Sequence, residues 1–308
     1  IFLWIYQTTL LNIFAELYIM SLTNIPCVIV HTGYKPYLKY NLEITSKNNQ
    51  VYLIGDSSLK KLEDINNNIQ FIDIKKYEEN IITKKYKNCF INYSSQPSDL
   101  EWMNFKRVFI MHQFLYENNL ETIFHMDSDN VLLRDINSFE FVSKNAYCIP
   151  SFQENFRMDS SIHCGLLDIT FFQAYRNLYE DLYLNKSKLN LIQEKIDHHK
   201  LNNIRGGITD MTLYFLMQKL ELIMPQNLME PIENKDSNKY IFLNNINLAE
   251  GYMSKQNFEI NRKGRVKIYN GNSVNDLIEN KIVRIANIHF QGSAKKQLNR
   301  FTKYRLIY

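Results

Sequence analysis

An apolar segment near the middle of the chain constrains the fold more than any other feature. It reads Ile123-Phe124-His125-Met126-Asp127-Ser128-Asp129-Asn130-Val131-Leu132-Leu133. Consecutive apolar residues are typical of a strand that is buried on both faces of a sheet. In extended backbone, positions i and i+2 point to the same side, so the carboxylates of Asp127 and Asp129 are expected to converge. Two such carboxylates favour a hard divalent cation that keeps coordination positions open for other oxygen ligands.

Strand-like and helix-like segments alternate along the first half of the chain. This alternation predicts an α/β fold with a mainly parallel central sheet. Ligands of such sheets gather at the carboxyl ends of the strands, and both Asp56 and Asp127 follow expected strands. The second half is less regular, and 232–275 is rich in turn residues. The expected strands are 27–30, 50–54 and 71–74, and the expected helices are 35–47, 100–119 and 209–220.

Length and composition narrow the class of protein. The chain has 308 residues and no linker rich in Pro, Gly or Ser, which favours one large domain at 23–308. Its formal charge of +4 suits anionic ligands or membrane surfaces without requiring nucleic acid, and no aromatic-basic RNA signature is present. The four cysteines have no C-x-x-C spacing, which argues against a zinc site or a disulfide framework. We therefore expect a reducing compartment, the cytoplasm, for this protein.

The N-terminal segment 1–22 is expected to lie outside this domain. It is apolar but interrupted by polar residues, and it lacks the basic start of a signal peptide. We expect an amphipathic or accessory helix there, and residues 1–19 could be dispensable to the fold. The interrupting residues are Gln7, Thr8, Thr9, Asn12 and Glu16.

The Asp127-Ser128-Asp129 triplet admits several interpretations. A solvated turn would have the same residues. A calcium loop fails, because Val131 and Leu132 replace an oxygen ligand and the required glycine. A phosphatase that uses Asp127 as its nucleophile fits the local pattern, but the chain has no Asp-Asp pair downstream to hold its Mg²⁺. The remaining interpretation is a site for a metal and a sugar nucleotide.

Three later motifs accompany the triplet in order. Together the four resemble GT-A fold glycosyltransferases, most nearly the glycogenin and lipooligosaccharide galactosyltransferase group, known as glycosyltransferase family 8. The resemblance implies a Rossmann-like single domain with a mixed, mainly parallel central sheet flanked by helices. The middle two motifs depart from the family pattern, at His163 and Cys164 and at Met211-Thr212. The later motifs are His163-Cys164-Gly165-Leu166-Leu167-Asp168-Ile169, Thr209-Asp210-Met211-Thr212-Leu213 and His289-Phe290-Gln291-Gly292-Ser293-Ala294-Lys295.

The resemblance also implies roles for single residues. It implies Mn²⁺, or Mg²⁺, bound by Asp127, Asp129 and His289, and Mn²⁺ accepts an imidazole nitrogen more readily. Lys295 would neutralise the departing UDP as a catalytic group, and Asp210 would position the acceptor hydroxyl or take its proton. The partners would be a UDP-sugar and a glycan, glycolipid or protein acceptor, with retention of configuration. Donor-binding residues would be Thr32, Gly33, Asp56, Arg107, Asp127, Ser128, Asp129, Gly292 and Lys295.

Alternatives remain open at several of these positions. His289 in an apolar run could be a core histidine, Arg107 a solvated helix charge, and Thr209 or Asp210 a helix cap. A phosphatase, or a sugar-nucleotide-binding protein without turnover, would also fit the triplet. The basic-aromatic tail 295–308 could contact the inner face of a membrane or form a final packed helix.

Overall fold

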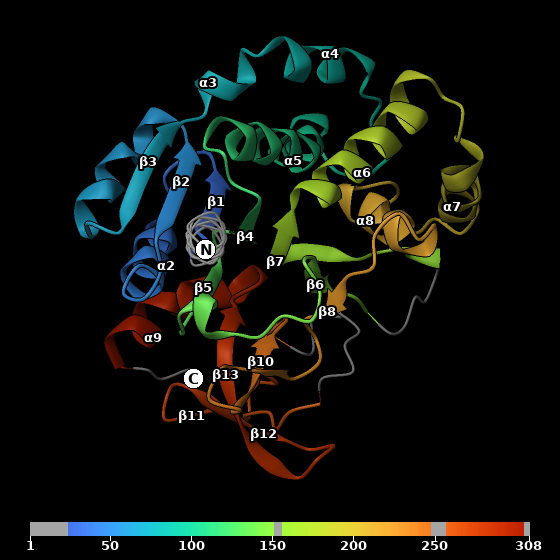
Figure 1. The fold of residues 1–308 in the computed structure, drawn as a ribbon. Coiled ribbons are helices and arrows are strands. Elements are labelled where there is room, and N and C mark those ends of the chain that lie inside the picture. Colours follow the sequence, from blue (N-terminus) through green and yellow to red (C-terminus); the bar gives the residue numbers. More distant parts are fainter. Residues whose placement is uncertain (1–23, 151–155, 248–256, 305–308) are drawn as a thin grey trace, which may run out of the picture.

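The computed structural model describes residues 24–150, 156–247 and 257–304, which form two β-sheets with helices packed around them (Figure 1). The larger sheet has seven strands in the order β3-β2-β1-β4-β7-β6-β8. Its first four strands run parallel, whereas β7 is antiparallel to both β4 and β6. These strands are β1 (Cys27–His31), β2 (Val51–Gly55), β3 (Ile69–Asp73), β4 (Thr122–Met126), β6 (Ala146–Cys148), β7 (Ser161–Asp168) and β8 (Gln226–Asn227).

The larger sheet confirms the predicted mixed, mainly parallel sheet flanked by helices. Parallel strands end at a common edge, so the segments that follow β1, β2 and β4 are neighbours there. The expected helices are present, and each begins and ends within a few residues of its predicted bounds. The helices are α2 (Pro36–Thr45), α3 (Lys75–Glu78), α4 (Ile81–Cys89), α5 (Ser98–Glu117), α6 (Ile169–Tyr179), α7 (Asn190–Leu201), α8 (Asp210–Lys219) and α9 (Leu298–Tyr304).

Alternate side chains of β1 fill two separate apolar clusters. Val28 and Val30 pack with α5, α6 and α8 on one face of the sheet. Cys27 and Ile29 pack on the other face with α2 and with Phe242 of the second sheet. In Figure 1, α3, α4 and α5 accordingly lie on one side of the larger sheet and the second sheet lies on the other. Burial on both faces is the reason that these strands are continuously apolar.

The second sheet was not expected from the turn-rich stretch 232–275. It has six strands, of which five run in the order β11-β12-β13-β10-β9, while β5 pairs with β13. Two of these strands, β9 and β11, have only two residues each, too few for a period-two pattern to be recognised. The strands are β5 (Asn130–Leu132), β9 (Ile232–Glu233), β10 (Lys239–Leu243), β11 (Ile268–Tyr269), β12 (Ser273–Asp276) and β13 (Lys281–His289).

The pairing of β5 with β13 connects the two sheets beside the aspartates. It is antiparallel and sets His289 opposite Asn130, the residue that follows Asp129. Two buried amides reinforce it: Asn287 Nδ2 donates to Asn130 Oδ1 at 2.9 Å, and Asn130 Nδ2 donates to the His163 carbonyl at 2.9 Å. Residues distant in the sequence are thereby brought together by main-chain pairing.

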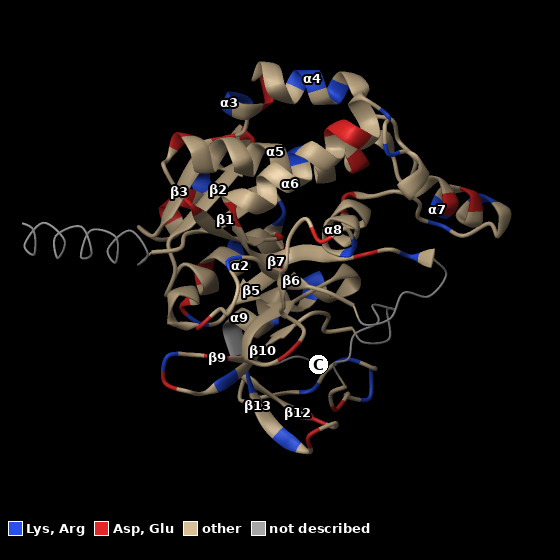
Figure 2. Ribbon diagram, turned by 45° about the vertical axis from the view of Figure 1, so that its right-hand side comes forward, with Lys and Arg blue, Asp and Glu red and all other residues tan. Residues whose placement is uncertain are grey.

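The described residues include part of the basic-aromatic tail at the C-terminal end of the chain. The segment 1–22 lies outside the described residues. In α9, Leu298 and Phe301 are fully buried, and the Phe301 ring contacts Phe290, which agrees with a packed final helix for this part of the tail. Within the described residues, no helix combines the length and apolarity needed to cross a membrane. Figure 2 shows both basic and acidic residues on α7, and the whole chain likewise has a formal net charge of only +4.

Removing the Asn287 amide should destabilise the fold. Asn287→Ala leaves the buried Asn130 Oδ1 without its partner, so we expect the free energy of unfolding to fall by about 1–3 kcal/mol. Asn67→Ala, at an exposed turn position, should change it by no more than about 0.5 kcal/mol. Urea unfolding of both variants measures the difference. Equal stabilities would show that the amide pair does not hold β5 to β13.

Candidate functional site

The two aspartates lie in a turn rather than in a strand. β4 ends at Met126, and the Asn130 N–H donates to the Asp127 carbonyl at 2.9 Å, which closes a four-residue turn before β5. The expectation of extended backbone at the two aspartates is therefore wrong. The turn directs the two side chains to different partners.

Asp129 faces His289 and Lys295. His289 Nε2 lies 3.6 Å from Asp129 Oδ1, and Lys295 Nζ lies 3.0 Å from Asp129 Oδ2. His289 Nδ1 lies 2.7 Å from the Asn244 carbonyl and donates to it, so Nε2 is the ring nitrogen turned toward Asp129. Burial lowers the pKa of His289, but the Asp129 carboxylate outweighs this and holds that pKa above its ordinary value. Asp129 therefore has a basic group on each oxygen.

Lys295 is positioned by a turn that begins at Gly292. Gly292 has a φ of +58°, in the left-handed region that favours glycine, and it starts the 3₁₀ turn Gly292–Gln297 that carries Lys295. The Lys295 ammonium also lies 5.4 Å from the centre of the Tyr37 ring. Burial lowers the pKa of Lys295, but Asp129 outweighs this and raises it above its ordinary value. The lysine is thus a fixed positive charge at the edge of the turn.

Asp127 is bound to Arg107. Arg107, on α5, forms an ion pair with Asp127 Oδ1 and donates from its other terminal nitrogen to Asp210 Oδ2 at 2.8 Å. Burial raises the pKa of Asp127, but Arg107 outweighs this and holds that pKa well below its ordinary value. Arg107 is therefore a bridge between two acidic groups, not the solvated helix charge that was its alternative.

Asp210 is 2% exposed at the start of α8. Its Oδ2 accepts hydrogen bonds from Arg107 and from the Tyr214 hydroxyl, the latter at 2.9 Å. Its neighbour Thr209 precedes the helix, and the Thr209 N–H donates to Thr212 Oγ1 at 3.4 Å, as expected for a helix start. The described contacts of Asp210 thus make it the buried anchor of Arg107, while its catalytic role stays a prediction.

His125 is a site residue that the sequence reasoning missed. It is fully buried in β4, its Nδ1 lies 3.0 Å from the Val28 carbonyl, and its Nε2 lies 3.4 Å from Asp127 Oδ1. Burial lowers its pKa. A signal was available, because His125 lies two positions before Asp127 in an apolar strand and so projects to the same side as the site.

Asp56 ties together the segments after β1 and β2. Its carboxylate accepts the Gly33 N–H and, at 2.9 Å, the Ser58 N–H. Burial raises the pKa of Asp56, but these hydrogen bonds outweigh it and hold the pKa below its ordinary value. Gly33 has a φ of +75°, and Thr32 is exposed beside it. The structure brings these three residues together, and their contact with a nucleoside stays a prediction.

Helix α2 holds the aspartate turn from one side. Asn41 Nδ2 donates to the Ser128 carbonyl at 2.8 Å, and the Tyr37 and Ser128 hydroxyls lie 3.3 Å apart. Gly207, shortly before α8, lies against the segment that contains Tyr93. A Cβ at Gly207 would lie 2.2 Å from the Tyr93 carbonyl oxygen.

Asp129 and His289 suit a divalent cation by their chemistry. A carboxylate oxygen and an imidazole nitrogen are ligands that Mn²⁺ accepts, and 3.6 Å between them is too long for a good hydrogen bond. In the described ranges, the ligand atoms of Asp127, Asp129 and His289 do not all lie within 4.8 Å of one another. The known contacts of Asp127 use Oδ1, so Oδ2 is the oxygen it would offer to a cation.

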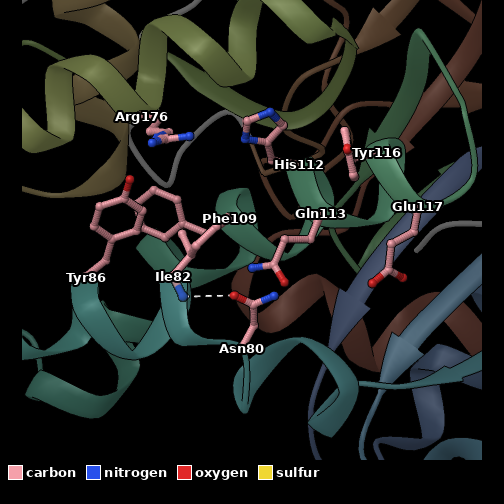
Figure 3. A pocket seen from close by; sticks show the side chains of 9 residues that line it. All are labelled: Asn80, Ile82, Tyr86, Phe109, His112, Gln113, Tyr116, Glu117 and Arg176. Carbon is pink, nitrogen blue, oxygen red and sulfur yellow. Dashed lines mark hydrogen bonds between the residues drawn. The ribbon is translucent and has the colours of Figure 1, made fainter.

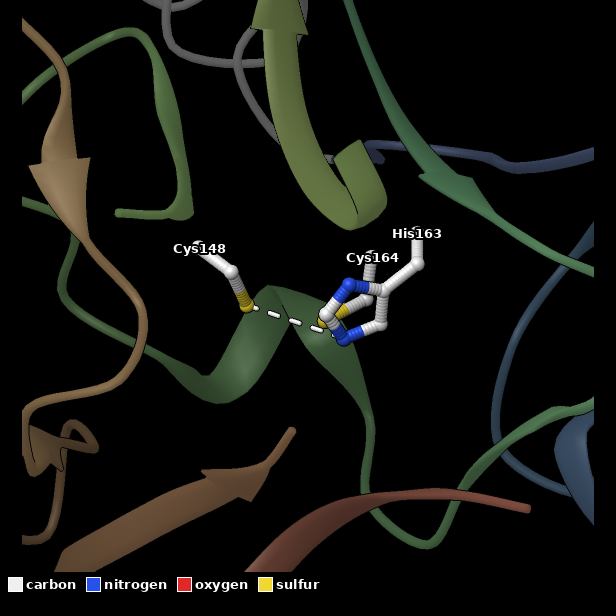
Figure 4. Close-up of side chains that lie close together, drawn as sticks. All are labelled: Cys148, His163 and Cys164. Carbon is white, nitrogen blue, oxygen red and sulfur yellow. Dashed lines mark hydrogen bonds between the residues drawn. The ribbon is translucent and has the colours of Figure 1, made fainter. Parts of the chain in front are cut away.

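A second group of ligand atoms was also missed. Cys148, His163 and Cys164 come together between β6 and β7, with all three ligand atoms within 4.8 Å of one another (Figure 4). The absence of a short cysteine spacing had argued against such a cluster, but strand pairing supplies the proximity. Burial raises the pKa of the Cys148 thiol, but hydrogen bonding to Cys164 and the nearby His163 outweigh it, so that the pKa is lowered.

A largely apolar pocket of about 420 Å³ lies between α4, α5 and α6. Figure 3 shows that its walls include Ile82, Tyr86, Phe109 and His112. It contains none of the predicted site residues.

Comparisons with known proteins give matches among solved structures but none at the level of sequence. No family model matches the sequence, and no curated protein matches it. The fold is similar to a solved structure described as PaToxG Glycosyltransferase, with 13% identity over 70% of this chain and 79% of that chain and a TM-score of 0.39. Likeness of this extent assigns neither a family nor an activity.

Arg107→Met should cost far more stability than removal of a surface arginine. It leaves Asp210 buried without its cationic partner, and we expect a loss of about 3 kcal/mol in the free energy of unfolding. Arg176→Met is the matched control, because Arg176 on α6 forms a surface pair with Glu180, the residue that follows this helix, and should cost at most about 1 kcal/mol. Chemical denaturation compares the two variants. Equal losses would contradict a buried bridge.

Proposed function

We propose that this chain is a metal-dependent glycosyltransferase of the GT-A type that moves a hexosyl group from a UDP-sugar to an acceptor hydroxyl. One observation carries the proposal: Asp129 lies between His289 and Lys295 at the edge of the sheet where parallel strands end. A carboxylate, an imidazole and an ammonium group in contact can hold a cation and a diphosphate together. Membership of the family 8 group is part of this proposal and rests on the sequence motifs.

The donor would be held by groups on both sides of the aspartate turn. Asp129, His289 and Asp127 would bind Mn²⁺ or Mg²⁺, which supplies Lewis-acid stabilisation of the diphosphate when bound. Gly292 would let the backbone approach the diphosphate closely. The nucleoside would lie near the segments after β1 and β2, where Thr32, Gly33 and Asp56 meet. Ser128 would contact the donor between the metal and the nucleoside.

Lys295 and Arg107 would each balance negative charge in the site during transfer of the sugar. The Lys295 ammonium would stabilise the negative charge that develops on UDP as the glycosidic bond breaks. Arg107 fixes the position of Asp127 and neutralises Asp210, and it would also lie near the donor sugar. Asp210 would position the acceptor hydroxyl, on a glycan, a glycolipid or a protein, once it exchanges part of its contact with Arg107. Retention of configuration follows from the family resemblance alone.

A phosphatase is less well supported by the same geometry. Its nucleophile would be Asp127, yet Oδ1 of that residue is occupied by Arg107 and His125. Attack on a phosphate would therefore have to come from the remaining oxygen, Oδ2. The basic groups instead surround Asp129, as a site for an anionic leaving group requires.

UDP should stabilise the protein only in the presence of a divalent ion, because two carboxylates would otherwise repel the diphosphate. With Mn²⁺ and UDP at one hundred times its dissociation constant, we expect a gain of about 2.7 kcal/mol in the free energy of unfolding. Asp129→Asn should abolish the shift. Asp73→Asn, at the exposed end of neighbouring β3, should keep it. Thermal unfolding with Mn²⁺ or with EDTA measures these shifts, and an equal shift in EDTA would refute a metal-bridged diphosphate.

Lys295→Met should slow cleavage of the UDP-sugar by about 10²-fold in kcat, because one positive group that stabilises the leaving diphosphate is removed. Lys296→Met provides the matched control, since Lys296 is the exposed next residue of the same turn. Release of UDP from a panel of UDP-sugars, with and without acceptors, gives both rates. If both variants kept the rate of the unaltered protein, Lys295 would have no part in departure of UDP.

A further inference from the structure

Three ligands of a kind suited to transition metals meet inside the larger sheet. Cys148 ends β6, and His163 and Cys164 are adjacent on β7, its antiparallel partner (Figure 4). Their exposed fractions are 0%, 3% and 0%, and their ligand atoms all lie within 4.8 Å of one another. We propose that Cys148, His163 and Cys164 bind one transition-metal ion, with Zn²⁺ as the first choice, at a site distinct from the proposed Mn²⁺ site.

The spacing of two of these atoms fits a tetrahedral ion. Bonds of about 2.3 Å to sulfur and about 2.05 Å to nitrogen place such ligands about 3.6 Å apart. Cys148 Sγ lies 3.6 Å from His163 Nε2. A thiol hydrogen-bonded to the imidazole has a similar separation, and the cobalt spectra described below distinguish it from a bound ion.

The orientation of His163 also suits a metal ligand. Its Nδ1 lies 3.0 Å from Ser161 Oγ, and we assign Nδ1–H as the donor, which leaves the Nε2 lone pair directed at Cys148. Metal-binding histidines generally use the second ring nitrogen in this way, because the hydrogen bond fixes the ring. Ser161, two residues earlier on β7, is thus the outer partner of the site.

The ion would have one ligand from outside the group. No other His, Cys, Asp or Glu ligand atom from 24–150, 156–247 or 257–304 completes the group at this separation, so water would take the fourth position. Each cysteine that binds as a thiolate releases one proton, and Zn²⁺ replaces those protons. Two thiolates and an imidazole favour Zn²⁺ over Mn²⁺, whereas Asp129 with His289 favours the harder ion.

An ion here would stabilise the neighbouring aspartate turn. The His163 ring stacks on the His289 ring, with centres 4.3 Å apart and planes 17° apart. The His163 carbonyl accepts the Asp127 N–H at 2.7 Å and the Asn130 amide at 2.9 Å. Fixing His163 would therefore fix the backbone of the turn and one face of His289. The role we assign is structural, and it does not depend on the proposed transfer reaction.

Metal content and cobalt spectra test the site directly. Protein purified without chelator and dialysed after addition of Zn²⁺ should retain about one Zn²⁺ per chain by elemental analysis. Co²⁺ added to metal-free protein should give intense thiolate-to-cobalt charge-transfer absorption and the visible bands of a tetrahedral ion. The Asp129–His289 site offers no sulfur, so Co²⁺ bound there gives no such absorption.

Single-residue variants show which side chains give the retained Zn²⁺ and the charge-transfer band. Cys148→Ala and Cys164→Ala should lose the Zn²⁺ and the charge-transfer band, and His163→Gln should weaken both. Cys27→Ala is the matched control, because Cys27 is equally buried on the same face of the sheet and should keep both signals. Asp129→Asn should also keep them, so failure of the proposed Mn²⁺ site would leave the zinc result unchanged.

Several results would overturn the proposal. These are an absence of retained Zn²⁺ in the unaltered protein, Co²⁺ binding without thiolate absorption, and a band that survives in both cysteine variants. A Cys148–Cys164 disulfide in freshly purified protein, seen as two missing thiols after unfolding without reductant, would also overturn it. The first two measurements need no variant, so they hold even if a cysteine substitution prevents folding.

Discussion

The antiparallel pairing of β5 with β13 is the contact on which the rest of the site depends. The chain leaves the larger sheet at the end of β4, turns at Asp127–Asn130 and at once enters the second sheet as β5. The partner strand β13 arrives from far along the sequence and ends at His289, opposite Asn130. A short turn that joins two sheets thus fixes Asp129 beside His289 and Lys295, and the buried Asn130–Asn287 amides make any other register costly.

The turn also separates the two aspartates electrostatically. Asp127 is directed into the helical side of the sheet, where Arg107 and His125 meet its Oδ1. Asp129 is directed to the second sheet, where imidazole and ammonium groups meet it. Two carboxylates so close together repel each other, and a separate cationic partner for each keeps both ionised. A cation could then bind between them without first having to displace a proton from either carboxylate.

The sequence predicted the part of the fold whose pattern is local. Long helices and buried strands such as β1 and β4 carry periodic or continuous apolar residues, so their positions followed from the residues alone. The second sheet was not predicted, because its strands pair over long distances in the sequence and two of them are too short to show a period. The candidate site divides in the same way: Asp127 and Asp129 are visible as a motif, whereas the Arg107–Asp210 bridge and the Cys148–His163 contact exist only after strands and helices pack.

Strand β7 links these features physically. Gly165 permits close pairing, since a Cβ there would lie 3.0 Å from the Ala146 carbonyl oxygen and 3.2 Å from Tyr147 Cβ. That approach lets β6 bring Cys148 to His163, although the register shifts between Tyr147 and Cys148. The same His163 supports the aspartate turn through its carbonyl and His289 through its ring. His163 and Cys164 are therefore the residues through which the core of the sheet contacts the site. Their substitution would alter the position of the aspartates without removing any group that faces a substrate.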